Sequence, residues 1–193
     1  MGRRRNAGLT LLELLIVLAI TTIVAGAVYT SSLMGGKLYF SSETYVHVQQ
    51  QARQALDTMV RELRQADGTI TVAANQCTFQ LALGYNLAAP CPANAVCIGA
   101  QDQNGAAQSG WSLRYRLNGT QLIREILDPA GVVQPVTRVL ANDVSSLSFT
   151  YTGGATNTVT VQLQVQRDSQ QLAGGSLAAA PTPLVTRIKL RNP

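Results

Sequence analysis

Histidine, aromatic residues and charge are scarce in this 193-residue sequence, and each scarcity excludes a class of function. His47 is the only histidine, which leaves little for a multi-histidine metal site or a Ser-His-Asp triad. Aromatic residues make up 5% of the chain, too few for an extended surface on which nucleic-acid bases stack. Charged residues make up 13%, and no acid–base pair stands out. We therefore expect no enzymatic activity, no metal and no cofactor.

Loops that bind phosphate or calcium are also missing from the sequence pattern. Gly35-Gly36 and Gly153-Gly154 lack the longer glycine-rich motif that ends in Lys-Ser or Lys-Thr. Asp128, Asp143 and Asp168 lack the spacing of an EF-hand. We expect these aspartates to lie in surface loops and Gly153-Gly154 to turn the chain.

The first thirty residues contain the longest apolar run, residues 9–28, which reads LTLLELLIVLAITTIVAGAV. About 20 apolar residues suffice to span a bilayer as a helix. Arg3, Arg4 and Arg5 precede the run, so the positive-inside rule keeps residues 1–8 cytoplasmic and sends the C-terminal part outward. Without these three, 12 of the 15 basic residues remain against 10 acidic ones, a charge of +2. Most of the net positive charge therefore lies in the segment that sets membrane orientation, and DNA is a weak candidate partner.

Glu13 is the only charged residue in the apolar run. A carboxylate in a membrane-spanning helix costs roughly 2.5–3.5 kcal/mol on insertion scales, so such a residue marks a functional site. An ordinary signal anchor, or a secretory peptide cut near Ala25-Gly26-Ala27, would also begin with a basic region and an apolar core. Glu13 is difficult to explain in a peptide that is cleaved off and discarded.

The segment Gly8-Leu9-Thr10-Leu11-Leu12-Glu13 resembles the processing site of type IV prepilins and pseudopilins, with Leu9 where that family most often has Phe. The resemblance implies that prepilin peptidase cuts after Gly8, that the new N-terminus at Leu9 is methylated, and that Glu13 is an assembly contact. It divides the chain into a leader, residues 1–8, a transmembrane and assembly helix, residues 9–40, and a periplasmic or extracellular domain, residues 41–193.

The helix is expected to continue beyond the membrane. Residues 39–66 contain neither proline nor glycine, and Gly68 is the expected stop. Apolar residues recur at steps of three and four, which places them on one helical face. This face consists of Val48, Ala52, Ala55, Met59, Leu63 and Ala66.

After Gly68 the apolar period changes to two, which predicts strands. They are expected at residues 70–72, 77–83, 111–117, 121–127, 136–140, 144–151, 159–166 and 185–190, with loops at 90–108 and 168–183. Asn118-Gly119 predicts a tight hairpin turn. One helix followed by such strands predicts an α+β domain in which an antiparallel sheet packs on the helix. No internal repeat is apparent.

Four segments of the body are similar to the W-type minor pilins and to the J-type minor pseudopilin of type II secretion. They are residues 53–68, 111–124, 139–151 and 186–192. The resemblance implies a low-abundance subunit in the bacterial inner membrane, which helps to start or cap a filament and is assembled into a pilus or pseudopilus. Its partners would be other major and minor pilins or pseudopilins and the inner-membrane platform. The choice between pilus and secretion system stays open.

Cys77, Cys91 and Cys97 all fall in the part expected to lie outside, where disulfides are permitted. Three cysteines allow three pairings, each of which leaves one thiol over. We prefer Cys91 with Cys97, which would close a short loop, to the pairings that involve Cys77. No fourth soft ligand lies nearby in the sequence, which disfavours a metal site.

Overall fold

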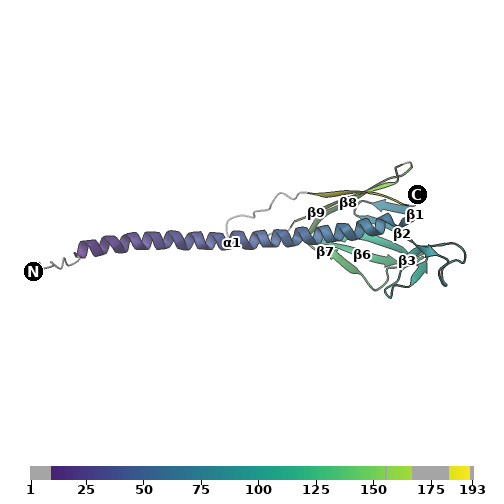
Figure 1. Cartoon of the computed structure of the whole chain (residues 1–193), viewed down its shortest axis with the longest axis horizontal. Helices are drawn as coiled ribbons and strands as arrows, with labels where there is room; N and C mark the ends of the chain where they lie inside the picture. Colours follow the sequence, from purple (N-terminus) through teal and green to yellow (C-terminus); the bar gives the residue numbers. More distant parts are fainter. Residues whose placement is uncertain (1–9, 155, 167–182, 192–193) are drawn as a thin grey trace, which may run out of the picture. The chain divides into compact units, whose positions relative to one another are not determined.

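A computed structural model describes residues 10–154, 156–166 and 183–191, with side chains for all of these except 36–45, 68 and 69. The chain divides into two compact units, Met1–Thr44 and Tyr45–Pro193. Helix α1, Leu11–Arg64, contributes to both units and is labelled in Figure 1.

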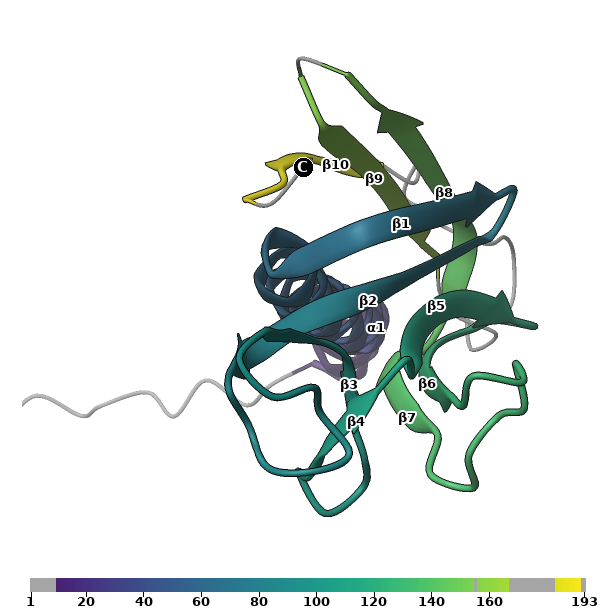
Figure 2. The same ribbon diagram turned by 90° about the vertical axis from the view of Figure 1, so that its right-hand side faces the viewer.

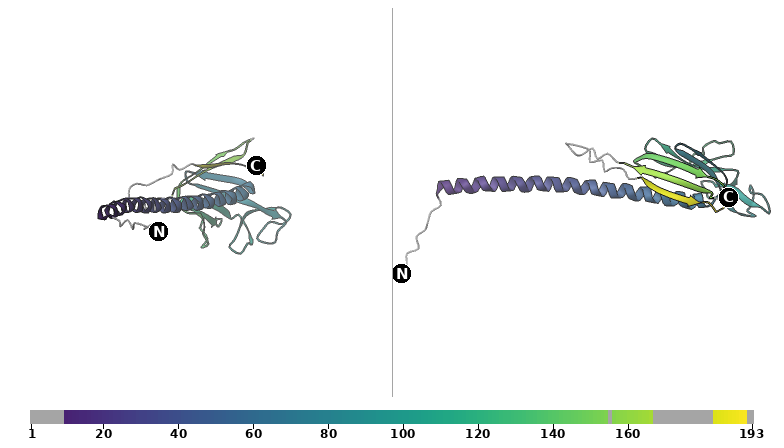
Figure 3. Two further views of the ribbon diagram at one scale, coloured as in Figure 1. Left: turned by 60° about the vertical axis from the view of Figure 1, so that its left-hand side comes forward. Right: turned by 90° about the horizontal axis from the view of Figure 1, so that it is seen from above.

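Ten strands follow α1 among the described residues, and they form two antiparallel sheets. The first contains β1 Ala66–Ala73, β2 Gln76–Tyr85, β3 Val96–Gln101, β4 Ala107–Ser109, β5 Ser112–Asn118, β6 Gln121–Leu127 and β7 Arg138–Ala141. Its order is β4-β3-β2-β5-β6-β7, and β1 pairs with β2. The second contains β8 Val144–Thr152, β9 Thr158–Val165 and β10 Leu184–Lys189, in the order β10-β9-β8 (Figure 3, right). The predicted α+β class is confirmed, with the strands divided between two sheets.

The predicted apolar face of the helix is buried. Its five residues in α1, from Val48 to Leu63, are each at most 4% exposed. They share one core with Phe79 and Leu113 of the first sheet and Leu163 of the second. The expected stop at Gly68 is wrong, since α1 ends at Arg64 and Ala66 already pairs with Leu81 as the first residue of β1. Figure 2 looks nearly along α1 and shows β9 and β10 above it and β3 and β4 below it. Burial of a side chain such as Leu63 stabilises the fold by roughly 1.5–3 kcal/mol, so this face anchors the helix to both sheets.

The hairpin of β5 and β6 turns one residue later than the sequence pattern predicts. Asn118 pairs with Gln121, so the two turn residues are Gly119 and Thr120 instead of Asn118 and Gly119. Gly119 has a φ of +60°, which suits the first turn position of a two-residue hairpin. The resulting register places Leu113 opposite Ile126, and both side chains are buried in the core.

The helix-facing side of this hairpin carries a polar cluster. The hydroxyl of Tyr115 donates a hydrogen bond to Glu62 of α1, and Arg124 Nε lies 3.0 Å from Glu62 Oε2. Burial raises the pKa of Tyr115, and the neighbouring Glu62 carboxylate adds to the effect. Tyr115 therefore stays a neutral donor, and the cluster fixes α1 against β5 and β6 at one position.

The opposite side of the hairpin carries a second cluster around Glu125, which is 2% exposed. Arg114 Nη2 lies 2.6 Å from Glu125 Oε2, and Arg116 Nη2 lies 2.8 Å from Oε1. Burial by itself would raise the pKa of Glu125, but hydrogen bonds from Arg116 and Arg114 outweigh burial and hold the pKa below its usual value. The carboxylate is therefore charged and paired at neutral pH.

The prediction of a loop at residues 90–108 is wrong, because this range contains β3 and the first two residues of β4. Glycine and alanine are frequent in these strands, so large apolar and polar residues do not alternate as in a typical strand. Gly99 shows why a glycine is required, since a Cβ at this position would lie 2.0 Å from the carbonyl oxygen of Gln108. Close pairing of β3 with β4 thus depends on a residue that a pattern of apolar side chains does not register.

The strands at the C-terminal end follow the predicted alternation. Val159, Val161 and Leu163 of β9 are fully buried, and Ile188 of β10 is 1% exposed. The expected loop at 168–183 lies outside the described residues, apart from its last position.

Glu125→Gln tests the buried ion-pair cluster. A carboxylate whose pKa is lowered by folding stabilises the protein above its unfolded pKa of about 4.3, and this stabilisation is lost as pH falls through the folded pKa. We expect Glu125→Gln to destabilise residues 45–193 by about 1–3 kcal/mol at pH 7 and to weaken the loss of stability on acidification. Denaturant unfolding at pH 7 and pH 3 measures both.

The control is Asp57→Asn, which alters an exposed carboxylate on α1. It should change stability by no more than about 0.5 kcal/mol. A Glu125→Gln variant with the pH dependence of the wild type would show that this cluster does not contribute.

Candidate functional site

Helix α1 begins directly after the expected cleavage site. The side-chain oxygen of Thr10 accepts a hydrogen bond from the backbone N–H of Glu13 at 3.3 Å, and the Thr10 carbonyl accepts one from Leu14 at 3.2 Å. Thr10 is therefore the N-cap of the helix. The pattern Thr-x-x-Glu before an apolar run is a signal of this start in the sequence. Gly8 and Leu9 lie outside the described residues.

Glu13 lies in the first turn of α1 and is exposed. Its neighbours one turn further along, Ile16 and Val17, are 52% and 57% exposed. Every residue from Thr10 to Gly35 is exposed. Glu13 is the only acidic or basic residue among them. Residues 10–35 therefore present an uncovered apolar helix with one carboxylate near its N-terminal end.

Three threonine hydroxyls further along this helix bond to its own backbone. Thr21 donates to the carbonyl of Val17 at 2.6 Å, and Thr22 donates to that of Ala19 at 2.9 Å. Thr30 donates to the carbonyl of Gly26 at 3.1 Å. Hydroxyls that bond the preceding turn need no water, which suits a helix in lipid or packed among other apolar helices.

By length and composition, Leu11–Gly35 can cross a membrane. Its most apolar stretch of 18 residues has a mean hydropathy of 2.5, and no part of that stretch is buried within the chain. The bilayer requires about 20 apolar residues, which the segment exceeds.

Residues 3–29 match the family described as the prokaryotic N-terminal methylation motif. The chain carries a prepilin-type leader. The matched residues contain the Gly8–Leu9 bond, Glu13 and most of the apolar helix, and they support a protein of the type IV pilin or pseudopilin kind. No curated protein and no solved structure shows a significant match to the chain.

A prepilin-type leader implies processing by prepilin peptidase and assembly with other pilins. Together with the apolar helix that follows, it indicates anchoring in a membrane. Thr10 caps the N-terminal end of α1 and Glu13 lies in its first turn, so both lie directly after the expected cleavage site in the sequence.

The cysteines lie in the second unit. Cys91 and Cys97 form a disulfide with a Cα–Cα distance of 5.2 Å, and Cys77 is a buried free thiol in β2. Burial raises the pKa of the Cys77 thiol to about 12, which keeps it protonated and unreactive.

Other candidate residues are not brought together into a site. His47 is exposed on α1. Among the residues that the structure describes, no three His, Cys, Asp or Glu side chains converge as metal ligands would. Asp168 lies outside those residues.

Thiol labelling with iodoacetamide tests the cysteine assignment. We expect the native protein to take up no label, the unfolded protein one label at Cys77, and the unfolded and reduced protein three. Two or more labels without reduction would contradict the disulfide. Replacing both Cys91 and Cys97 by serine should lower stability by on the order of 2 kcal/mol, because the closed loop is short.

Proposed function

We propose that the chain is a minor structural subunit of a type IV pilus, which helps to start or cap the filament. The observation that carries the proposal is the uncovered apolar helix that begins at a prepilin-type cleavage site and bears one carboxylate, Glu13. Roles in adhesion, motility or DNA uptake would follow from the filament it joins. The alternative is a minor pseudopilin of a type II secretion system, which would use the same helix in the same way.

The apolar surface needs two successive environments under this proposal. Side chains such as Leu11 and Ile23, at 79% and 72% exposure, have no cover within the chain. Lipid of the inner membrane covers them first, with residues 45–193 in the periplasm. Neighbouring subunits cover them after extraction into the fibre. Both environments are apolar, so the transfer changes the free energy of this surface little.

Apolar contact alone would not set the axial position of one subunit against the next, because apolar helices can slide past each other. Glu13 supplies a polar constraint. Its backbone N–H is bonded by Thr10, and no described side chain bonds its carboxylate. Cleavage after Gly8 would create an ammonium at Leu9, which in a dry interface needs an anion. Within one chain the reach back to the free terminus is poor, so Glu13 of one subunit would face Leu9 of another.

The second unit would be the part that distinguishes this subunit from others in the filament. Its segments at 53–68, 111–124, 139–151 and 186–192 are similar to W-type minor pilins and J-type minor pseudopilins. The genes beside its own would discriminate the two systems, since pilus and competence genes differ from secretion genes. DNA binding at a filament tip is less well supported, because the mature charge would be only +2.

Glu13→Val tests the assembly contact. We expect cleavage and membrane insertion to be unchanged or improved, because a costly carboxylate is removed. Incorporation into filaments should fall by about tenfold or more, because the Leu9 ammonium would remain buried without a partner, at a cost of about 3–5 kcal/mol. The measurement is the ratio of mature protein in sheared fibres to mature protein in membranes.

Thr22→Val is the matched control, since it also replaces a polar residue by valine on the same exposed helix. It should assemble like the wild type. Equal assembly of Glu13→Val and Thr22→Val would refute the contact, and the charge in the apolar helix would then have no explanation.

A further inference from the structure

Although no internal repeat is apparent from the sequence pattern, the structure contains two similar seven-residue loops, residues 102–108 and 128–134, here called the first and second tip. Residues 102–108 read DQNGAAQ and residues 128–134 read DPAGVVQ. Each segment begins with an aspartate at the end of a strand, has a glycine of positive φ at its fourth position, and ends with a glutamine. The first tip connects β3 to β4, and the second follows β6.

The two tips share their hydrogen bonds. Asp102 N donates to the carbonyl of Ala106 at 2.9 Å, and Asp128 N donates to that of Val132 at 3.1 Å. In each tip one carboxylate oxygen accepts two backbone N–H groups. The backbone hydrogen bond from Ala106 holds the pKa of Asp102 below its usual value. Both tips are therefore preorganised by their own aspartates.

The closing glutamines differ between the tips. Gln108 Nε2 donates to Asp102 at 3.1 Å, whereas Gln134 Nε2 lies 3.5 Å from Asp128, too far for a strong bond. Gln134 also lines a cleft of about 130 Å³, and Gln108 does not. The amide of Gln134 is thus only loosely held by its own tip and is available to a ligand.

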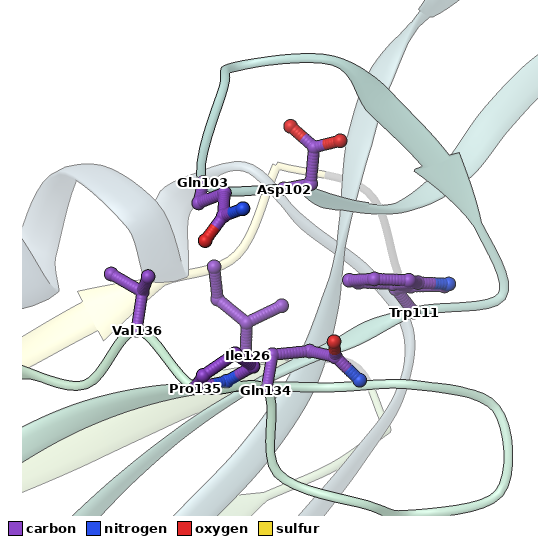
Figure 4. A pocket seen from close by; sticks show the side chains of 7 residues that line it. All are labelled: Asp102, Gln103, Trp111, Ile126, Gln134, Pro135 and Val136. Carbon is purple, nitrogen blue, oxygen red and sulfur yellow. The ribbon is translucent and has the colours of Figure 1, made fainter.

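The cleft lies between the two tips, with Gln103 from the first tip and Gln134 from the second (Figure 4). Ile126 occupies its centre, and Pro135 and Val136 complete its apolar part. Trp111, seen edge-on in Figure 4, lines another side. The carboxylate of Asp102 points away from the cleft, in keeping with its bonds inside the tip.

Trp111 is held in place by its surroundings. It is partly exposed and packs against the core. The preceding residue, Gly110, has a φ of +75°, and its carbonyl accepts a hydrogen bond from Gln80 at 3.1 Å. A fixed, partly exposed indole beside two amides is a surface that can bind a ligand with little loss of conformational entropy.

We propose that this cleft binds one pyranose ring of a saccharide. Its volume is below the roughly 300–1,000 Å³ of sites for drug-sized ligands, so it suits a single ring. None of the described residues that line it is basic, which disfavours a phosphate. The negative face of an indole attracts the C–H groups of a sugar ring, and glutamine amides both donate to and accept from hydroxyls.

Trp111 is the only tryptophan in the chain, so its fluorescence reports on the cleft alone. The experiment titrates the full-length protein, in a zwitterionic detergent without a sugar headgroup, with the methyl glycosides of glucose, galactose, mannose and N-acetylglucosamine. Concentrations reach about 50 mM, since weak single-ring binding lies in the millimolar range. We expect a saturable change in emission with at least one glycoside and none with mannitol, which has hydroxyls but no ring.

Gln103→Ala and Gln134→Ala should each weaken this binding about threefold to tenfold, the effect of one lost hydrogen bond. Gln162→Ala, an exposed glutamine on β9, is the matched control and should bind like the wild type. The proposal is overturned if no glycoside gives a saturable change, or if both cleft variants bind like the wild type. A response to a proline-rich peptide without one to any glycoside would also overturn it.

Discussion

An apolar surface that the chain does not cover is the constraint on which the rest of this structure depends. The first half of α1 exposes every residue from Thr10 to Gly35, and its threonines beyond the first turn bond their own backbone. Such a helix requires lipid or other apolar helices around it. Glu13 is the only charged residue in this segment, and under our proposal its carboxylate specifies the position of a neighbouring subunit. The matched motif at residues 3–29, which contains Glu13, fits this division of roles.

The second half of α1 faces a different requirement, since it must hold a folded unit. Small and apolar residues between Val48 and Leu63 pack on both sheets, and the Glu62 carboxylate bonds Tyr115 and Arg124. Apolar packing supplies most of the stability, and the polar cluster specifies which turn of the helix meets the β5–β6 hairpin. One continuous helix therefore combines an uncovered apolar segment with one that is fixed to its own domain.

The helix, its buried face and the α+β class could be predicted because they depend on periodicity and on one long apolar run. The β5–β6 register could not, since it required Gly119 as the first turn residue. Counting from that turn would have placed Arg114 opposite Glu125 and so revealed the buried ion pair. β3 could not be predicted from a pattern of apolar side chains, because Gly99 must lack a side chain for β3 to pair with β4. The cleft beside Trp111 depends on two distant hairpin tips, which no local pattern brings together.

Processing of the N-terminus tests the central claim most directly, because both the apolar helix and Glu13 acquire their proposed roles only in a mature chain. Intact-mass measurement of the protein from membranes should give a chain of 185 residues, 193 minus 8, that begins at Leu9 and carries one added methyl group. A bulky residue in place of Gly8 should leave the chain uncut. A mature chain that begins near Ala27 would contradict the account, since Glu13 and the apolar helix would then be discarded.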